Sequence, residues 1–206
     1  MGGWEKFNTF AIWMLKVAYL NILWIGFTIL GLGVLGLFPS TGAMFTIAQK
    51  WLRKEPVDKI FLTFWKTYKK EFITLNKFGL FFILIGYILV YDFMFVQKNL
   101  DKLQLLFPIL LFLAISYIVT LLYFIPVYTQ FEMKFFQYIK QSFLIAASSL
   151  LETILILTAC MLIGILVNFI PGTIPFFTGS VLAIAITWCS NRALFKINSK
   201  KKIVTH

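Results

Sequence analysis

Few residues of this sequence have the chemistry for catalysis or metal binding. The single histidine, His206, is the last of 206 residues, so neither a histidine-based triad nor a histidine-rich metal site can be assembled. Cys160 and Cys189 lie in different hydrophobic stretches without C-x-x-C spacing, and we expect them to be small packing residues. Motifs for nucleotide, dinucleotide or zinc-protease chemistry are absent from the sequence. We therefore predict no catalytic residue, no cofactor, no metal site and no enzyme activity; a carboxylate-based, lipid-modifying enzyme is a weaker alternative.

Charged residues within hydrophobic stretches would mark an ion or substrate pathway. Asp92 lies about four residues from the end of its stretch, a depth of roughly 6 Å along a helix. Glu152 and Lys16 also lie near the ends of theirs, where a long side chain can reach the polar headgroups. We interpret all three residues as interfacial, not as part of a transport path.

Five long hydrophobic stretches must position these residues. They run approximately over residues 17–37, 79–96, 103–128, 150–170 and 176–195, and most reach the roughly 20 residues needed to cross a bilayer. Hydrophobic residues make up 60% of the chain, whereas soluble domains average about 45–50%. The sequence predicts an all-α fold, namely a polytopic transmembrane helical bundle of about five spans plus interfacial amphipathic helices. We expect one membrane domain over residues 1–206.

The basic residues fall mainly on one side of the predicted spans. Fifteen of the 19 lysines and arginines lie after the first stretch, after the third stretch or at the C-terminal end from Arg192 onward, and short loops rich in such residues stay in the cytoplasm. The sequence therefore predicts an external N-terminus and a cytoplasmic C-terminus. The net charge of +11 is then explained by topology, so we expect membrane lipids as partners and no nucleic acid.

A run of glycines with one proline lies between residues 31 and 43. Such residues favour a broken or re-entrant helix, which a membrane tolerates only where protein or water satisfies the freed backbone groups. Gly36, Pro39 and Gly42 are the candidates for this loop break. If residues 44–51 also enter the bilayer, the number of spans becomes six and the N-terminus is cytoplasmic. The sequence leaves both alternatives open.

Residues 44–77 form a predicted cytoplasmic amphipathic region. Its second half carries an aromatic stripe at helical spacing, with lysines on the opposite side: Phe61, Phe64, Trp65, Tyr68 and Phe72. Such a helix either rests in the membrane interface against lipid or docks a partner through its apolar face. The five aromatic residues are therefore candidates for partner docking. A similar segment over residues 131–140 precedes the fourth span.

Several segments of the chain resemble one family of membrane proteins. They are residues 20–24 (LNILW), 31–36 (GLGVLG), 38–45 (FPSTGAMF), 51–54 (WLRK), 61–72 (FLTFWKTYKKEF) and 123–126 (YFIP), the last followed by Phe131 and Glu132. Together they are similar to the YesL family of bacterial integral membrane proteins. The resemblance covers most of the chain, most strongly residues 20–72.

The resemblance implies a five-span protein of the bacterial cell membrane that is associated with carbohydrate uptake, and it supplies no catalytic residues. We therefore expect an accessory integral-membrane subunit of an ABC-type carbohydrate (oligosaccharide) importer. Its partners would be the permease, through the helices, and the ATPase, with residues 61–72 as the candidate contact. The alternative is a self-sufficient channel or carrier for a small solute, with the break over residues 31–43 forming the passage. The transported sugar is not encoded in any motif.

Overall fold

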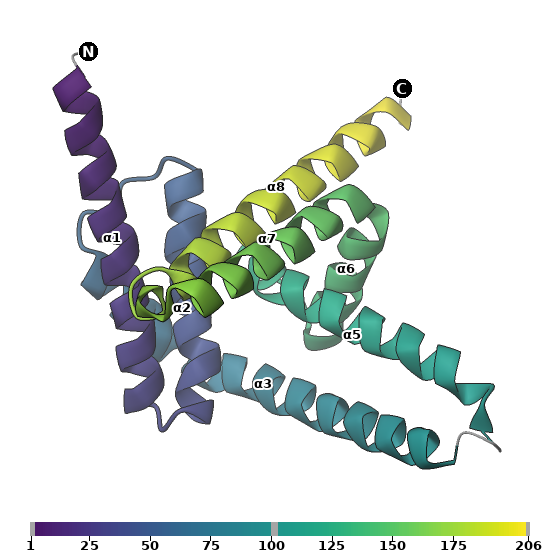
Figure 1. Ribbon diagram of the computed structural model, residues 1–206. Coiled ribbons are helices and arrows are strands. Elements are labelled where there is room, and N and C mark those ends of the chain that lie inside the picture. The colour runs from purple at the N-terminus through teal and green to yellow at the C-terminus, as the bar shows by residue number, and fades with distance from the viewer. Residues whose placement is uncertain (1–2, 100–102, 205–206) are drawn as a thin grey trace.

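The computed structural model describes residues 3–99 and 103–204, and the side chains of residues 4–99 and 103–197. Within these ranges every regular element is helical, which confirms the all-α fold. The elements are α1 (Gly3–Leu30), α2 (Val34–Leu52), α3 (Ile60–Lys98), α5 (Leu106–Tyr128), α6 (Phe135–Ser148), α7 (Leu150–Phe169), the 3-10 turn η1 (Pro171–Thr173) and α8 (Thr178–Val204). Figure 1 shows their arrangement.

Four of the described helices are long and apolar enough to cross a membrane, by length and composition. They lie over Trp4–Leu30, Ile60–Lys98, Leu106–Tyr128 and Leu150–Phe169, in agreement with a membrane protein. The fifth predicted span, residues 176–195, forms most of α8 instead, which is not among these four. Its buried face carries Ser180, Thr187 and Ser190, each without exposed surface. Helix α8 contacts α1, α2, α5, α6 and α7 as a central helix.

The predicted first span is interrupted at residues 31–33, where α1 turns into α2. Leu32 and Gly33 adopt positive φ angles of 60° and 74°, and glycine allows that conformation without steric cost. Gly36 then packs against α1 so closely that a Cβ atom there would lie 2.5 Å from the Thr28 carbonyl oxygen. The two helices therefore form an antiparallel hairpin. A hydrogen bond between the hydroxyl oxygens of Thr28 and Ser40, which lie 2.7 Å apart, also joins them.

The predicted position of the loop break, at Gly36, Pro39 and Gly42, is wrong, because all three residues lie inside α2. A proline within a helix leaves the carbonyl four residues earlier without its backbone donor. Here that carbonyl belongs to Leu35, and it accepts a hydrogen bond of 3.0 Å from the Asn76 side-chain amide of α3. The helix can therefore continue through Pro39. Gly42 is a packing position, where a Cβ atom would lie 2.3 Å from Leu75.

Helix α3 joins two elements that the sequence predicts as separate, the interfacial helix over residues 61–72 and the span over residues 79–96. No proline falls between them, and the lysines and the glutamate of residues 66–71 favour a helix. Figure 1 shows the second half of α3 and the first half of α5 extending together away from the remaining helices. Their outer halves form what we call the α3–α5 arm.

A buried asparagine joins the first helix to the last. Asn21, which has no exposed surface, donates from Nδ2 to the carbonyl oxygens of Ile174 (3.0 Å) and Pro175 (2.8 Å). Its Oδ1 accepts from the backbone N–H of Ser180 at 3.0 Å, in the first turn of α8. The Ser180 hydroxyl in turn donates to the Val17 carbonyl at 2.9 Å. Asn21 thus acts as the N-cap of a helix distant in sequence.

Candidate functional site

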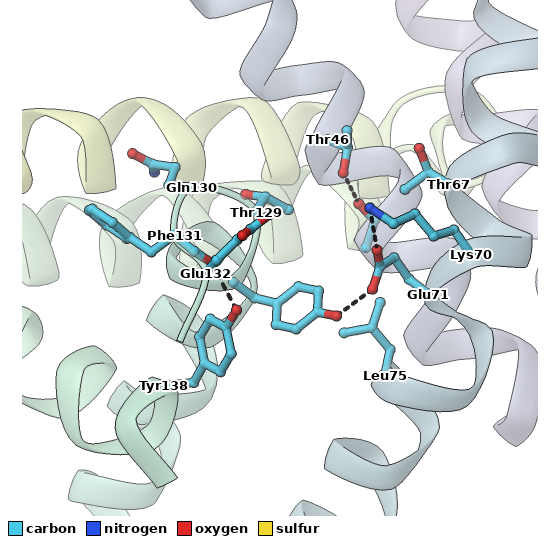
Figure 2. A pocket seen from close by; sticks show the side chains of 12 residues that line it. Thr46, Thr67, Lys70, Glu71, Leu75, Thr129, Gln130, Phe131, Glu132 and Tyr138 are labelled. Atoms are coloured by element: carbon cyan, nitrogen blue, oxygen red, sulfur yellow. Dashed lines mark hydrogen bonds and ion pairs between the residues drawn. The ribbon is translucent and has the colours of Figure 1, made fainter. Parts of the chain in front are cut away.

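A polar pocket of about 370 Å³ lies where α2, α3 and the segment between α5 and α6 meet (Figure 2). Its lining combines hydroxyl, amide, carboxylate and ammonium groups with aromatic rings: Gly42, Thr46, Thr67, Lys70, Glu71, Leu75, Tyr128, Thr129, Gln130, Phe131, Glu132 and Tyr138. We call it the α2–α3–α5 pocket. Half of these lining residues belong to the segments that carry the family resemblance: Gly42, Thr67, Lys70, Glu71, Phe131 and Glu132.

Glu71 is the central charged group of the pocket. Its carboxylate accepts a hydrogen bond from the Tyr128 hydroxyl and pairs with the Lys70 ammonium group at 3.6 Å. The Glu71 side chain is 19% exposed, whereas that of Lys70 is 80% exposed. The carboxylate is therefore held in place by α5, while its countercharge lies on the solvent side.

The uncharged polar groups of the pocket retain unused hydrogen-bonding capacity. Among the described residues, the buried side-chain nitrogen of Gln130 has no acceptor. The Thr46 hydroxyl donates to the Gly42 carbonyl at 2.9 Å and the Thr129 hydroxyl donates to the Pro126 carbonyl at 3.0 Å. Both oxygens can still accept hydrogen bonds. The Gln130 nitrogen has no accessible surface, and Figure 2 shows its side chain directed away from Thr46 and Thr67, so the groups that a ligand could reach are the threonine hydroxyls.

Aromatic rings pack against the inner side of the pocket. Tyr128 and Tyr138, which line it, lie 5.0 Å apart between ring centroids. Behind them the ring of Phe78 stacks on Phe135 at 4.2 Å and packs against Phe124 at 4.8 Å. Phe78 and Phe124 are 2% and 1% exposed. These five residues, which we call the aromatic cluster, separate the pocket from the α3–α5 arm.

The aromatic stripe predicted to dock a partner is largely used inside the molecule. Phe64, Trp65 and Tyr68 surround Phe27 of α1, with ring centroids 5.1 to 5.4 Å from it. Phe64 is fully buried and Tyr68 nearly so, while Phe61, 6.1 Å from Phe27, stays 46% exposed.

Phe72, the last docking candidate, is half-buried and packs edge-on against Tyr68 at 5.5 Å. The docking assignment is therefore wrong for Phe64 and Tyr68. Helical periodicity identifies a buried face without showing which element covers it.

A second charged group lies between α7 and α8. Glu152 is 2% exposed and forms an ion pair with Lys196, whose side chain is 47% exposed. The interpretation of Glu152 as a hydrated interfacial residue is therefore wrong: α8 covers it. Next to this pair, the Arg192 guanidinium group lies over the Trp188 ring, 4.7 Å from its centroid.

Within the described ranges no group of three histidine, cysteine, aspartate or glutamate side chains is placed to hold a metal ion. Cys160 is half-buried and Cys189 is buried, and neither forms a disulfide. His206 lies outside the described residues. The sequence reasoning missed Thr67, Glu71 and Thr129 as site residues, although Thr67 and Glu71 lie beside aromatic residues in a resembling segment.

Comparisons with known proteins give a consistent result. The family model described as "Protein of unknown function, DUF624" matches residues 17–93. Three proteins of Bacillus subtilis (strain 168), each described as uncharacterized, align with nearly the whole chain. YteU is 32% identical over 197 residues (95% of this chain, 86% of YteU) and YesL 31% over 195 residues (95% and 92%). YesV is 32% identical over 188 residues (91% and 90%). No solved structure matches the chain.

Proposed function

We propose, from the premise that this chain belongs to the YesL-like family that contains DUF624, that it is an accessory subunit of an ABC-type carbohydrate importer. It would be an integral protein of the bacterial cell membrane, with lipids, the permease and the ATPase as partners, and the proposal assigns no reaction to it. The carbohydrate part of the proposal rests on the resemblance to the YesL family. The choice between an accessory subunit and a carrier rests on the structure.

The observation that carries this choice is the aromatic cluster at the inner side of the α2–α3–α5 pocket. A carrier needs a polar site that communicates alternately with both faces of the membrane. Here the rings of Phe78, Phe124 and Phe135 are packed together beyond the pocket, and both Phe78 and Phe124 are buried. A polar pocket that ends in packed rings favours a binding or interaction role over transport by this chain alone.

The α3–α5 arm offers a surface for the permease. An apolar groove of about 480 Å³ runs between the two helices, lined among others by Val90, Phe93, Ala114 and Ile118. Small residues let membrane helices approach closely, and Ala114 supplies one within the groove. We propose that a transmembrane helix of the permease occupies it. The arm extends away from the remaining helices (Figure 1), so such a helix can approach without rearranging the bundle.

Co-purification in mild detergent tests this role, with the permease and ATPase subunits as the recovered partners. Ala114→Phe fills the groove, whereas Leu113→Phe enlarges a neighbouring side chain of α5 that is 46% exposed and does not line the groove. We expect wild type and Leu113→Phe to recover the subunits equally and Ala114→Phe to recover at most a tenth as much. Absence of any stoichiometric complex with the wild-type protein would exclude the accessory role.

A self-sufficient carrier is the second candidate, and the polar α2–α3–α5 pocket is the observation that favours it. The purified protein alone, reconstituted into lipid vesicles, distinguishes the two functions. Uptake of a labelled sugar above that of protein-free vesicles would support the carrier. An accessory subunit gives no such uptake.

The hairpin of α1 and α2 bears on the orientation in the membrane. Because the helices are antiparallel, residue 6 and the loop at residues 53–59 lie toward the same end of the hairpin. This arrangement supports the six-span alternative, in which the N-terminus is cytoplasmic, over the predicted external N-terminus. Lys6 then joins the cytoplasmic set, and 16 of 19 basic residues obey the positive-inside rule.

Single cysteines decide between the two orientations. In a background without Cys160 and Cys189, Lys6→Cys and Glu55→Cys should both react with an impermeant thiol reagent only from the cytoplasmic side. Reaction of the Lys6→Cys variant from outside in intact cells would restore the five-span topology.

A further inference from the structure

We infer that the α2–α3–α5 pocket binds a neutral, polyhydroxylated small molecule of the size of a mono- or disaccharide. The inference deepens the proposed function, and it rests on that function for the use of sugars as probes. The ligand class itself follows from the charge, the hydrogen-bonding groups and the size of the pocket. Its volume of about 370 Å³ lies at the small end of ligand sites, which span about 300–1,000 Å³.

The charge of the pocket argues for a neutral ligand. Lys70 compensates the Glu71 carboxylate at 3.6 Å, and Tyr128 donates a hydrogen bond to the same carboxylate. The remaining charged group of the lining, Glu132, is exposed. A charged ligand placed beside Glu71 would lose hydration and meet a charge that is already paired. A neutral ligand avoids that cost.

The hydrogen-bonding groups argue for hydroxyls on the ligand. The Thr46 and Thr129 hydroxyls donate to backbone carbonyls, and their oxygens remain available to accept hydrogen bonds from a ligand. The Thr67 hydroxyl makes no hydrogen bond among the described residues and can do either. Figure 2 shows Thr46 and Thr67 on one side of the pocket and Thr129 on the other, supplied by different elements. A ligand with several hydroxyls satisfies both sides, because each hydroxyl can donate to the Thr46 or Thr129 oxygen and can also bond the Thr67 hydroxyl.

The aromatic part of the lining is compatible with the carbon face of a sugar. Tyr138 lines the pocket and is buried. Tyr138 is fixed by two hydrogen bonds, donating to the Phe131 carbonyl at 2.8 Å and accepting from the Met133 backbone N–H at 3.0 Å. A ring held in this way offers a rigid apolar surface beside the polar groups, as ligand sites commonly do.

Calorimetric titration of the full chain in lipid nanodiscs tests the inference. The neutral probes are glucose, galactose, xylose and maltose, and the charged probes are glucuronate and glucosamine. We expect saturable binding of at least one neutral sugar, and binding at least tenfold weaker for both charged probes. Saturable binding of none of the four neutral sugars would overturn the inference. Equal or tighter binding of a charged probe would also overturn it.

Two pocket variants and one matched control assign the binding to this pocket. Thr67→Val keeps the shape of the side chain and breaks no hydrogen bond within the described protein, so it should fold normally and weaken sugar binding at least threefold. Thr63→Val makes the same change one helical turn earlier, outside the lining, and should leave binding unchanged. Glu71→Gln should weaken binding at least tenfold; if it does not fold, Thr67→Val alone decides. Unchanged binding by Thr67→Val would contradict the assignment.

Recovery of the permease, measured for the same variants, separates this inference from the proposed function. Loss of sugar binding by Thr67→Val with normal permease recovery supports the pocket and leaves the accessory role intact. Normal sugar binding by a wild-type protein that recovers no permease would exclude the accessory role and still support the pocket.

Discussion

Replacing Asn21 with alanine should destabilise the fold more than any other single polar truncation in α1. The change removes three well-formed hydrogen bonds, two to the carbonyls of Ile174 and Pro175 and one from the Ser180 backbone N–H. Loss of an N-cap costs about 1 kcal/mol. Each interhelical side-chain hydrogen bond in a membrane protein averages about 0.6 kcal/mol, and a buried group left unpaired costs about 1–3 kcal/mol. Because these contributions overlap, we expect a loss of about 3 kcal/mol.

This loss can be measured as a change in the free energy of unfolding, by unfolding the protein in mixed micelles that contain an increasing fraction of a denaturing detergent. Asn8→Ala is the matched control, since it makes the same truncation in the same helix at an exposed position. We expect that control to stay within about 0.5 kcal/mol of wild type, as surface substitutions usually do. A destabilisation by Asn21→Ala of less than about 1 kcal/mol would refute the capping role, because one bond alone would then account for it.

Two further substitutions test the packing of the helices. Glu152→Gln removes one charge of the α7–α8 ion pair; because Lys196 is 47% exposed and solvent screens the pair, we expect a loss of about 1–2 kcal/mol in the same unfolding assay. Asp92→Asn, the matched control, should lose less than about 0.5 kcal/mol, and equal effects would contradict the special role of the buried carboxylate. Gly36→Val places a side chain against the Thr28 carbonyl and should sharply lower the yield of monodisperse protein. Gly26→Val, where no atom lies within 4 Å of the added Cβ, should not, and an equal yield from both would argue against the tight hairpin.

The membrane class, the helical fold and the family could be predicted because each depends on local composition or sequence pattern. The aromatic stripe of residues 61–72 was also recognised as a distinct face. What covers it could not be predicted, since the covering ring, Phe27, lies in another helix. The same limit applies to Pro39: its local effect is to break a helix, and the Asn76 amide that compensates for it comes from α3.

The candidate site shows the limit more strongly. Glu71 and Tyr128 meet across 57 positions of sequence, and neither residue type is unusual at the end of a membrane helix. The central position of α8 could not be predicted either, because nothing in the sequence shows that small polar residues such as Ser180 and Thr187 are buried packing positions.

The bond network of Asn21 has a consequence for how the protein is made. Its carbonyl partners and the Ser180 N–H lie 153 to 159 positions later in the chain. At about 5–20 residues per second, the ribosome needs roughly 8–30 s to synthesise that interval. During this time the side-chain amide of Asn21 in the nascent α1 has none of its final partners. In the bilayer an unsatisfied polar group is costly. Chains released before α8 is synthesised would keep that amide unpaired, and membrane quality control could thereby distinguish them from the finished protein.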